Sequence, residues 1–277
     1  MTRLLHLSDT HLMAPGGLHG GGRVDTTAVL RHVLASLAGV GPLDAVVVSG
    51  DVSDDGSVHS YESARDLVGG FAREHGAAVV AFAMGNHDLP GPFEQVLGPG
   101  RSVHDAGGLR LVVLDSSVPR HGHGVLGDEQ LTRLREVLAE PAPLGSVVVV
   151  HHPPLPAPTV LHEGLKLQGP QRLLDAIAGT DVRAVLSGHY HHPYVATLPG
   201  GLTAVVAPGV ANRTDVLVEH GSERAVRGSG ACLVDVDDAG VRVTVLSVAA
   251  PGDGEELFVL GPDVVQRILD AEGAPAR

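Results

Sequence analysis

The stretch GNHD at residues 85–88 decides how the chain is organised. It follows the apolar run 77–83, which predicts a buried strand. It precedes LPGP at 89–92, where the prolines cannot continue a strand and the chain must turn. Asn86, His87 and Asp88 are therefore expected at the carboxyl end of a strand, the edge at which open α/β sheets bind ligands. Alone, the stretch also fits an ordinary turn, because Asn tolerates left-handed backbone angles.

Four further apolar runs end in the same kinds of side chain. The runs at 3–7, 43–48, 146–150 and 182–186 predict buried strands, and Asp or His follows each of them. Five such strand ends are hard to explain by turn chemistry. Because a parallel or mixed sheet brings strand ends into one crevice, we expect a single site. Its candidate residues are Asp9, His11, Asp51, Asn86, His87, Asp88, His151, His189 and His191.

Composition indicates one globular domain over residues 1–277. Hydrophobic residues make up 43% of the chain, aromatic residues only 3%, and no Trp occurs. A core of Val, Leu and Ala suits buried strands that helices cover. A β-rich part begins at about residue 195, with strands at 203–206, 231–236 and 241–248 that we expect to be antiparallel, since no helix intervenes. A loose tail is expected from about residue 271.

Charge and cysteine content exclude several classes of protein. The net charge of −13 speaks against a nucleic acid polymer as partner, whereas a small anionic substrate stays possible beside bound cations. Cys232 is the single cysteine, which excludes an internal disulfide and a multi-cysteine metal site. No apolar run approaches the about 20 residues of a membrane helix, and Asp9 belongs to the site, not to a signal peptide. We expect a cytoplasmic protein.

The candidate residues suit a pair of metal ions. Asp and His ligands without cysteine favour manganese, iron or zinc. Two divalent ions about 3.5–4 Å apart can share a carboxylate and hold both oxygens of an in-line displacement at phosphorus. Asp9-x-His11 and His189-x-His191 each direct two side chains to one side of a short extended segment, because strand side chains alternate with a period of two.

The motifs resemble the calcineurin-like metallophosphoesterase signature in their order along the chain. The matching blocks are Asp9-x-His11, Gly50-Asp51, GNHD at 85–88, HHPP at 151–154 and Gly188-His189-x-His191. The resemblance implies a four-layer αββα sandwich of two mixed β-sheets flanked by helices. It also implies a first metal held by Asp9, His11, Asp51 and His191, and a second that Asp51 bridges and Asn86, His151 and His189 complete.

The same resemblance implies a mechanism and a substrate. A hydroxide bridging the metals would attack phosphorus, His87 would stabilise the charge and protonate the leaving alkoxide, and Asp88 would orient His87. GDEQL at 127–131 and GSGAC at 228–232 are similar to the class III cyclic-nucleotide phosphodiesterases, most closely those of actinobacteria. The expected substrate is therefore a 3′,5′-cyclic nucleotide such as cAMP, and the expected assembly is a homodimer.

Alternatives remain for the function and for neighbouring residues. A 2′,3′-cyclic nucleotide or a glycerophosphodiester would use the same site, and a non-catalytic scaffold would predict degenerate ligands, whereas all are intact. We expect His152 to be structural, His6 to be buried and hydrogen-bonded, and Tyr190 to pack in the core. Asp54 is expected to cap its loop or to support a ligand, and the glycine-rich loop 16–22 to form a rim of the site.

Overall fold

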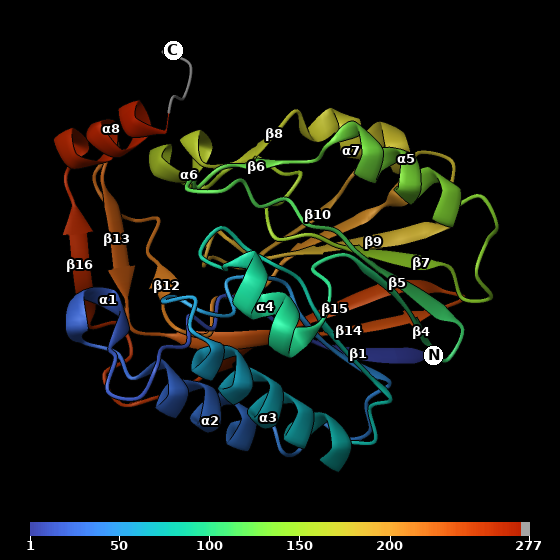
Figure 1. The fold of residues 1–277 in the computed structure, drawn as a ribbon, viewed down its shortest axis with the longest axis horizontal. Helices are drawn as coiled ribbons and strands as arrows, with labels where there is room; N and C mark the ends of the chain where they lie inside the picture. Colours follow the sequence, from blue (N-terminus) through green and yellow to red (C-terminus); the bar gives the residue numbers. More distant parts are fainter. Residues whose placement is uncertain (273–277) are drawn as a thin grey trace.

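Two β-sheets face each other between two layers of helices (Figure 1). The computed structural model describes residues 1–272, and residues 273–277 of the expected tail lie outside this part. The first sheet has the order β15-β14-β1-β2-β3, with β1, β2 and β3 parallel and β14 antiparallel to β1 and β15. Its strands are β1 (Thr2–Leu7), β2 (Ala45–Val48), β3 (Val79–Phe82), β14 (Ser229–Asp237) and β15 (Gly240–Val248).

The second sheet has the order β10-β11-β9-β7-β5-β4. Its four central strands are parallel, and the two outer strands are antiparallel to their neighbours. The strands are β4 (Ser102–Ala106), β5 (Leu109–Val113), β7 (Ser146–Val149), β9 (Val182–Ser187), β10 (Tyr194–Thr197) and β11 (Thr203–Val206).

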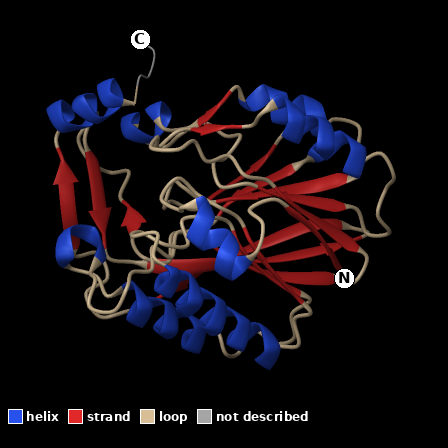
Figure 2. Ribbon diagram, viewed as in Figure 1, coloured by secondary structure: helices blue, strands red, loops and turns tan. Residues whose placement is uncertain are grey.

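Three hydrophobic clusters define the four layers. One joins the inner faces of the two sheets, with Val47 of β2 and Val147 of β7 among its buried members. A second packs the first sheet against α2 (Thr26–Ser36) and α3 (Val58–Glu74). The third packs the second sheet against α5 (Asp128–Val137) and α7 (Pro170–Ile177). The αββα sandwich expected from the family resemblance is thus confirmed (Figure 2).

Smaller elements cluster at one end of the sandwich. A three-stranded sheet stands at the left of Figure 1, with the order β12-β13-β16 and with α8 at one of its ends. We call this the small sheet, and its strands are β12 (Arg213–Thr214), β13 (Glu223–Val226) and β16 (Glu256–Leu260). The remaining elements are β6 (Gly124–Val125), β8 (Leu167–Gln168), α1 (His19–Gly22), α4 (Pro90–Leu97), α6 (Val160–Gly164), η1 (Pro199–Gly201) and α8 (Pro262–Ala271).

The sequence predicts the buried strands well and the exposed ones poorly. The expectation that 203–206 is antiparallel is wrong for one neighbour, since β11 pairs parallel with β9 and antiparallel with β10. The sequence analysis did not predict β10. This strand is largely exposed and lies at the edge of the sheet, so it leaves no apolar run in the sequence. β10 supplies the return crossing that a parallel neighbour of β9 requires, so no helix is needed between them.

The helices begin where the sequence places capping side chains. Asp25 accepts a hydrogen bond from the backbone N–H of Ala28 at 3.0 Å, and Ser57 accepts one from Ser60 at 3.2 Å. Among residues 1–272, no helix has the length and apolar character needed to cross a membrane.

Candidate metal centre

The backbone is unusual at the predicted ligands. Among the described residues, six non-glycine residues have a positive φ, and five of these are predicted ligands with φ between 43° and 69°. Left-handed backbone at a non-glycine residue is uncommon and costs on the order of 1–3 kcal/mol, and it concentrates at functional sites. The five are Asp9, His11, Asp51, His189 and His191. The fold therefore holds these five residues in a strained backbone conformation that an ordinary turn would not keep.

Two glycines let the ligand loops approach one another. A Cβ at Gly50, whose φ is +110°, would collide with the ring of His151, and a Cβ at Gly85 would collide with the carboxylate of Asp51. The glycines that precede Asp51 and Asn86 in the motifs are thus required by packing between segments distant in sequence.

Four predicted ligands come together from both sheets as a first cluster. Asp9, His11, Asp51 and His191 each offer a ligand atom, and these atoms lie within 4.8 Å of one another. The Nε2 atoms of His11 and His191 are 3.1 Å apart. Asp9 Oδ1 lies 3.4 Å from His191 Nε2, and Asp51 Oδ2 lies 3.5 Å from His11 Nε2.

A second cluster shares Asp51 with the first. Asp51 Oδ2 lies 3.4 Å from His151 Nε2, which is 3.2 Å from Asn86 Oδ1. The same carboxylate oxygen therefore faces imidazole nitrogens of both clusters, which fits the bridging position expected for Asp51. The backbone N–H of His87 donates to the other oxygen, Oδ1, at 2.9 Å and fixes the orientation of the carboxylate.

The outer nitrogen of each imidazole faces an oxygen acceptor. His151 Nδ1 lies 2.9 Å from the Ser49 carbonyl, and His191 Nδ1 lies 3.2 Å from the Asn212 carbonyl. His11 Nδ1 lies 3.0 Å from Asp54 Oδ1. Donation to these acceptors leaves the lone pair of each Nε2 for the centre, the arrangement that metal-binding histidines use.

His189 is anchored through its opposite nitrogen. Its Nε2 lies 3.0 Å from the Leu165 carbonyl, and burial with neighbouring histidines holds its pKa well below the ordinary value. The neutral ring that donates from Nε2 keeps a lone pair on Nδ1. His189 can therefore serve as a ligand through Nδ1, unlike the other three histidines.

The donor set fits divalent cations. Two ligands bonded to one ion at about 2.0–2.1 Å lie about 2.9–3.4 Å apart, depending on the bond angle. The separations in the two clusters, from 3.1 to 3.5 Å, lie within or just above this range. Lone pairs of His11 and His191 that face each other at 3.1 Å repel unless a cation or a proton lies between them. Two divalent ions would satisfy both clusters.

Charge within the centre is balanced by neighbouring rings. Burial alone would raise the pKa of Asp9, but His191 lowers it to about 2. Burial would likewise raise the pKa of Asp51, but His151 and His87 hold it well below its usual range. In return, Asp51 outweighs burial and raises the pKa of His151 to about 9. Both carboxylates are therefore ionised and buried, and they attract positive charge.

His87 lies at the mouth of the centre with Asp54 behind it. Its side chain is 44% exposed, and its Nδ1 lies 3.0 Å from Asp54 Oδ1. Burial lowers the pKa of His87, but Asp51 and Asp54 raise it to about 9. Asp54 also contacts His11 and, at 3.1 Å, His19 Nδ1. The supporting role considered for Asp54 thus matches its contacts.

Asp88 does not have the contacts that the sequence predicted. Its carboxylate accepts backbone N–H groups of Gly85 at 2.8 Å, Ser53 at 3.0 Å and Val52 at 3.1 Å. The expectation that Asp88 orients His87 is corrected, because Asp54 makes that contact. Asp88 instead ties its own loop to the loop after Asp51, and this pairing of distant segments is invisible in the sequence.

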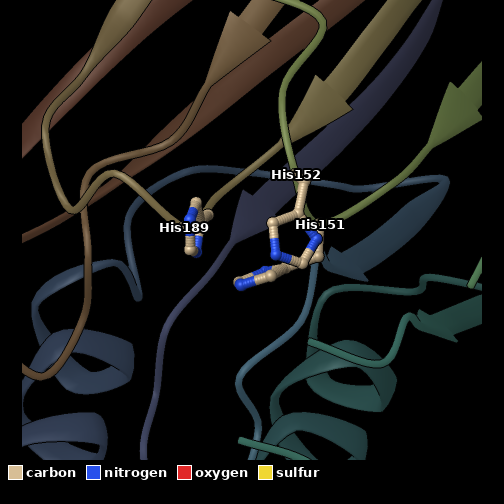
Figure 3. Close-up of side chains that lie close together, drawn as sticks. All are labelled: His151, His152 and His189. Atoms are coloured by element: carbon tan, nitrogen blue, oxygen red, sulfur yellow. The ribbon is translucent and has the colours of Figure 1, made fainter. Parts of the chain in front are cut away.

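His152 completes a group of three close histidines with His151 and His189 (Figure 3). However, His152 Nδ1 lies 2.8 Å from the Ser116 hydroxyl and Nε2 lies 2.9 Å from the Gly122 carbonyl. Both ring nitrogens are occupied, so the structural role expected for His152 is confirmed.

Two neighbours of the centre also match expectation. His6 is buried, its Nε2 lies 2.8 Å from the Ser49 hydroxyl, and burial lowers its pKa to about 3. Tyr190 is fully buried and donates to the Leu155 carbonyl at 3.0 Å.

A cavity of about 220 Å³ opens beside the centre. On one side it is lined by predicted ligands and His87. On the other side it is lined by residues of the small sheet and of α6, which sequence reasoning missed because nothing in their spacing indicates a ligand. These include His162, Thr214, Glu223, Phe258 and Leu260. His19 also lines it and comes from the glycine-rich loop that was expected to form the rim.

Comparison with known proteins gives one family and several relatives. The family model described as calcineurin-like phosphoesterase matches residues 2–193. A Rhodococcus erythropolis protein named "Probable cyclic nucleotide phosphodiesterase" is 39% identical over 98% of this chain and 94% of its own length. A Mycobacterium tuberculosis "cAMP/cGMP dual specificity phosphodiesterase" is 38% identical over 83% of this chain and 74% of its own.

A solved structure shares the fold at low sequence identity. The dimetal phosphatase from Danio rerio superposes with a TM-score of 0.57 and 13% identity, and it covers 90% of this chain and 99% of its own. At that identity the similarity concerns the fold.

Proposed function

Because the chain belongs to the calcineurin-like phosphoesterase family, we propose that it is a metal-dependent phosphodiesterase for 3′,5′-cyclic nucleotides such as cAMP. The observation that supports this most is the shared carboxylate. Asp51 Oδ2 faces His11 of one donor cluster and His151 of the other, at ligand–ligand distances. The names of the two relatives support the choice of a cyclic nucleotide.

Seven residues would hold the two cations. Asp9, His11 and His191 would hold one ion, Asn86, His151 and His189 the other, and Asp51 both. When bound, the ions would activate a water molecule as the nucleophile and neutralise the phosphate oxygens. Asp and His donors without cysteine favour manganese or iron, with zinc as a further candidate.

His87 would act on the leaving oxygen. Its Nδ1 faces Asp54, which leaves Nε2 free for the substrate. Against the effect of burial, Asp51 and Asp54 raise the pKa of His87, which favours the protonated and positively charged ring. It can therefore stabilise the extra negative charge on the phosphoryl group and then donate the Nε2 proton to the departing ribose oxygen.

The surroundings of the centre favour a small substrate. A cavity of about 220 Å³ admits only part of a polymer, and the net charge of −13 disfavours nucleic acid. A 2′,3′-cyclic nucleotide or a glycerophosphodiester is the alternative, since it needs the same chemistry at phosphorus. We also propose that the protein is cytoplasmic and that it forms a homodimer, and the family resemblance supports the dimer.

The test is hydrolysis of three substrates by the purified protein, with manganese added and with chelator. The substrates are 3′,5′-cAMP, 2′,3′-cAMP and bis(p-nitrophenyl) phosphate. We expect manganese-dependent hydrolysis of 3′,5′-cAMP. Hydrolysis of the artificial diester alone would refute the named substrate, and inactivity with every divalent metal would favour a non-catalytic scaffold.

A further inference from the structure

Glu223 on β13 is a buried carboxyl group that the chemistry at phosphorus does not use. It is 4% exposed and lines the same cavity as the predicted metal ligands. Its Oε2 atom has no hydrogen-bond partner among the described residues, and Oε1 lies 3.8 Å from His162 Nδ1, beyond hydrogen-bond distance. Oε2 is shielded from solvent, whereas Oε1 is not among the shielded atoms, and the side chain lines the cavity. Because a buried carboxyl group with few partners is costly, a donor that enters the cavity would stabilise it through Oε1.

The groups around Glu223 do not fully compensate for its burial. Burial raises the pKa of Glu223. The hydroxyls of Thr159 and Thr214 and the charge of His191 lower it, but by less than burial raises it. His162 cannot serve as a cationic partner, because burial lowers the pKa of its ring to about 3. Whether ionised or protonated, the carboxyl retains at least one acceptor oxygen.

Glu223 lies one layer of residues away from the metal ligands. The backbone N–H of Thr214 donates to the His191 carbonyl at 3.0 Å, and the ring of His162 is 5.6 Å from that of His189. A substrate group that reaches Glu223 must therefore be close to the phosphorus. In a 3′,5′-cyclic ribonucleotide, the 2′-hydroxyl stands on the carbon next to an esterified one. The amino group of the base is separated from phosphorus by the whole sugar.

We propose that Glu223 accepts a hydrogen bond from the substrate hydroxyl adjacent to the esterified carbon, the 2′-hydroxyl of a cyclic ribonucleotide. Glu223 thereby selects ribose over deoxyribose. The proposal rests on the proposed function for its named substrate. A glycerophosphodiester carries a hydroxyl in the same relation to its ester, so the recognised group is common to both candidate substrates.

The test compares kcat/KM for 3′,5′-cAMP with kcat/KM for 2′-deoxy-3′,5′-cAMP. We expect the native protein to prefer the ribonucleotide by about 10- to 100-fold, the order expected for one buried hydrogen bond to a carboxyl group. In Glu223→Gln, which keeps one acceptor oxygen, the ratio should fall in part, and in Glu223→Leu it should approach one. A merely structural role would lower both rates together and leave the ratio unchanged, which would overturn the proposal.

Glu256→Gln is the matched control, because Glu256 is an exposed carboxylate on β16 of the same small sheet. The ratio of kcat/KM for 3′,5′-cAMP to kcat/KM for its 2′-deoxy analogue should be the same in Glu256→Gln as in the native protein. Metal content and melting temperature show which variants fail to fold. If Glu223→Leu fails to fold, the ratio of kcat/KM for the two nucleotides in Glu223→Gln decides the test. A native ratio near one would also overturn the proposal.

Failure of the proposed function has a separate signature. If the native protein hydrolyses bis(p-nitrophenyl) phosphate but not cAMP, the named substrate is wrong. Glu223 is then tested with glycerophosphoethanolamine and its analogue without the 2-hydroxyl. Equal rates for that pair would refute the role of Glu223, and a preference that Glu223→Leu abolishes would support it.

Discussion

The two walls of the cavity are built on different principles. The ligand wall consists of loops at the strand ends of both large sheets, where five side chains have left-handed backbone and four imidazoles are each fixed through one nitrogen. The opposite wall belongs to the small sheet and α6, where Thr214, Glu223 and Phe258 sit on strands and have no positive φ, although the pairing of β13 with β16 shifts register after Ala225. The first wall has a strained backbone that hydrogen bonds and packing hold in place, whereas the second wall presents the side chains of unstrained residues.

The two walls have different tasks in the site. Residues that must meet ions within tenths of an ångström are held by a supporting shell. Residues that contact the rest of a substrate need only complementary shape and polarity. Substitutions in the ligand wall should therefore abolish turnover, and those in the opposite wall should change which substrate is preferred.

The largest effect is expected for Asp51→Ala. Its carboxylate faces both donor clusters, so its loss should remove metal from both and reduce kcat by more than about 10⁴-fold, the upper range for one essential group. Metal content by elemental analysis and kcat with excess manganese measure this. Asp66→Ala, an exposed carboxylate on α3, is the control. Two ions per chain in the variant would contradict the bridging role.

His87→Ala should separate binding of metal from turnover. The side chain is exposed at the mouth of the centre, so metal content should stay at the native value while kcat falls about 10²- to 10⁴-fold, the usual contribution of a general acid. His59→Ala, an exposed histidine on α3, is the control. Native turnover of an alkyl phosphodiester by His87→Ala would rule out the proton donor assigned here.

A smaller loss is expected for Asp54→Asn. The change removes the charge behind His11 and His87 but keeps the shape, so kcat or metal affinity should fall about 10- to 100-fold, as for other groups that orient ligands. Removing this charge should also lower the pKa of His87, which imidazole NMR signals can follow. Asp55→Asn changes the adjacent exposed carboxylate as a control. Unchanged kcat and metal affinity would mean that Asp54 only organises its loop.

The smallest effect is expected on the opposite wall. Phe258→Leu retains an apolar surface of similar size, so kcat/KM for cAMP should fall less than about 10-fold, mainly through KM. Val259→Ala, at an exposed neighbouring position, is the control. A loss of kcat as large as that of His87→Ala would show that the two walls are not separable in function.

The strands of the ligand wall could be predicted because burial leaves a continuous apolar run in the sequence. The edge strand β4 alternates between partly buried and exposed positions, and the edge strand β10 is exposed at all but one position, so both leave a weaker pattern in the sequence. Asp88 shows a second limit. The family resemblance implied that Asp88 orients His87, yet its carboxylate faces the backbone of residues more than 30 positions away.

The residue types of the metal centre and their positions at strand ends could be inferred from the sequence, because strands and turns are local and their periodicity appears in neighbouring residues. The packing of the chain fixes which nitrogen of each histidine faces the centre, which carboxylate supports His87, and that Glu223 lines the cavity. Those assignments depend on contacts between segments as far apart as Asp9 and His191, and such contacts exist only after the two sheets pack together.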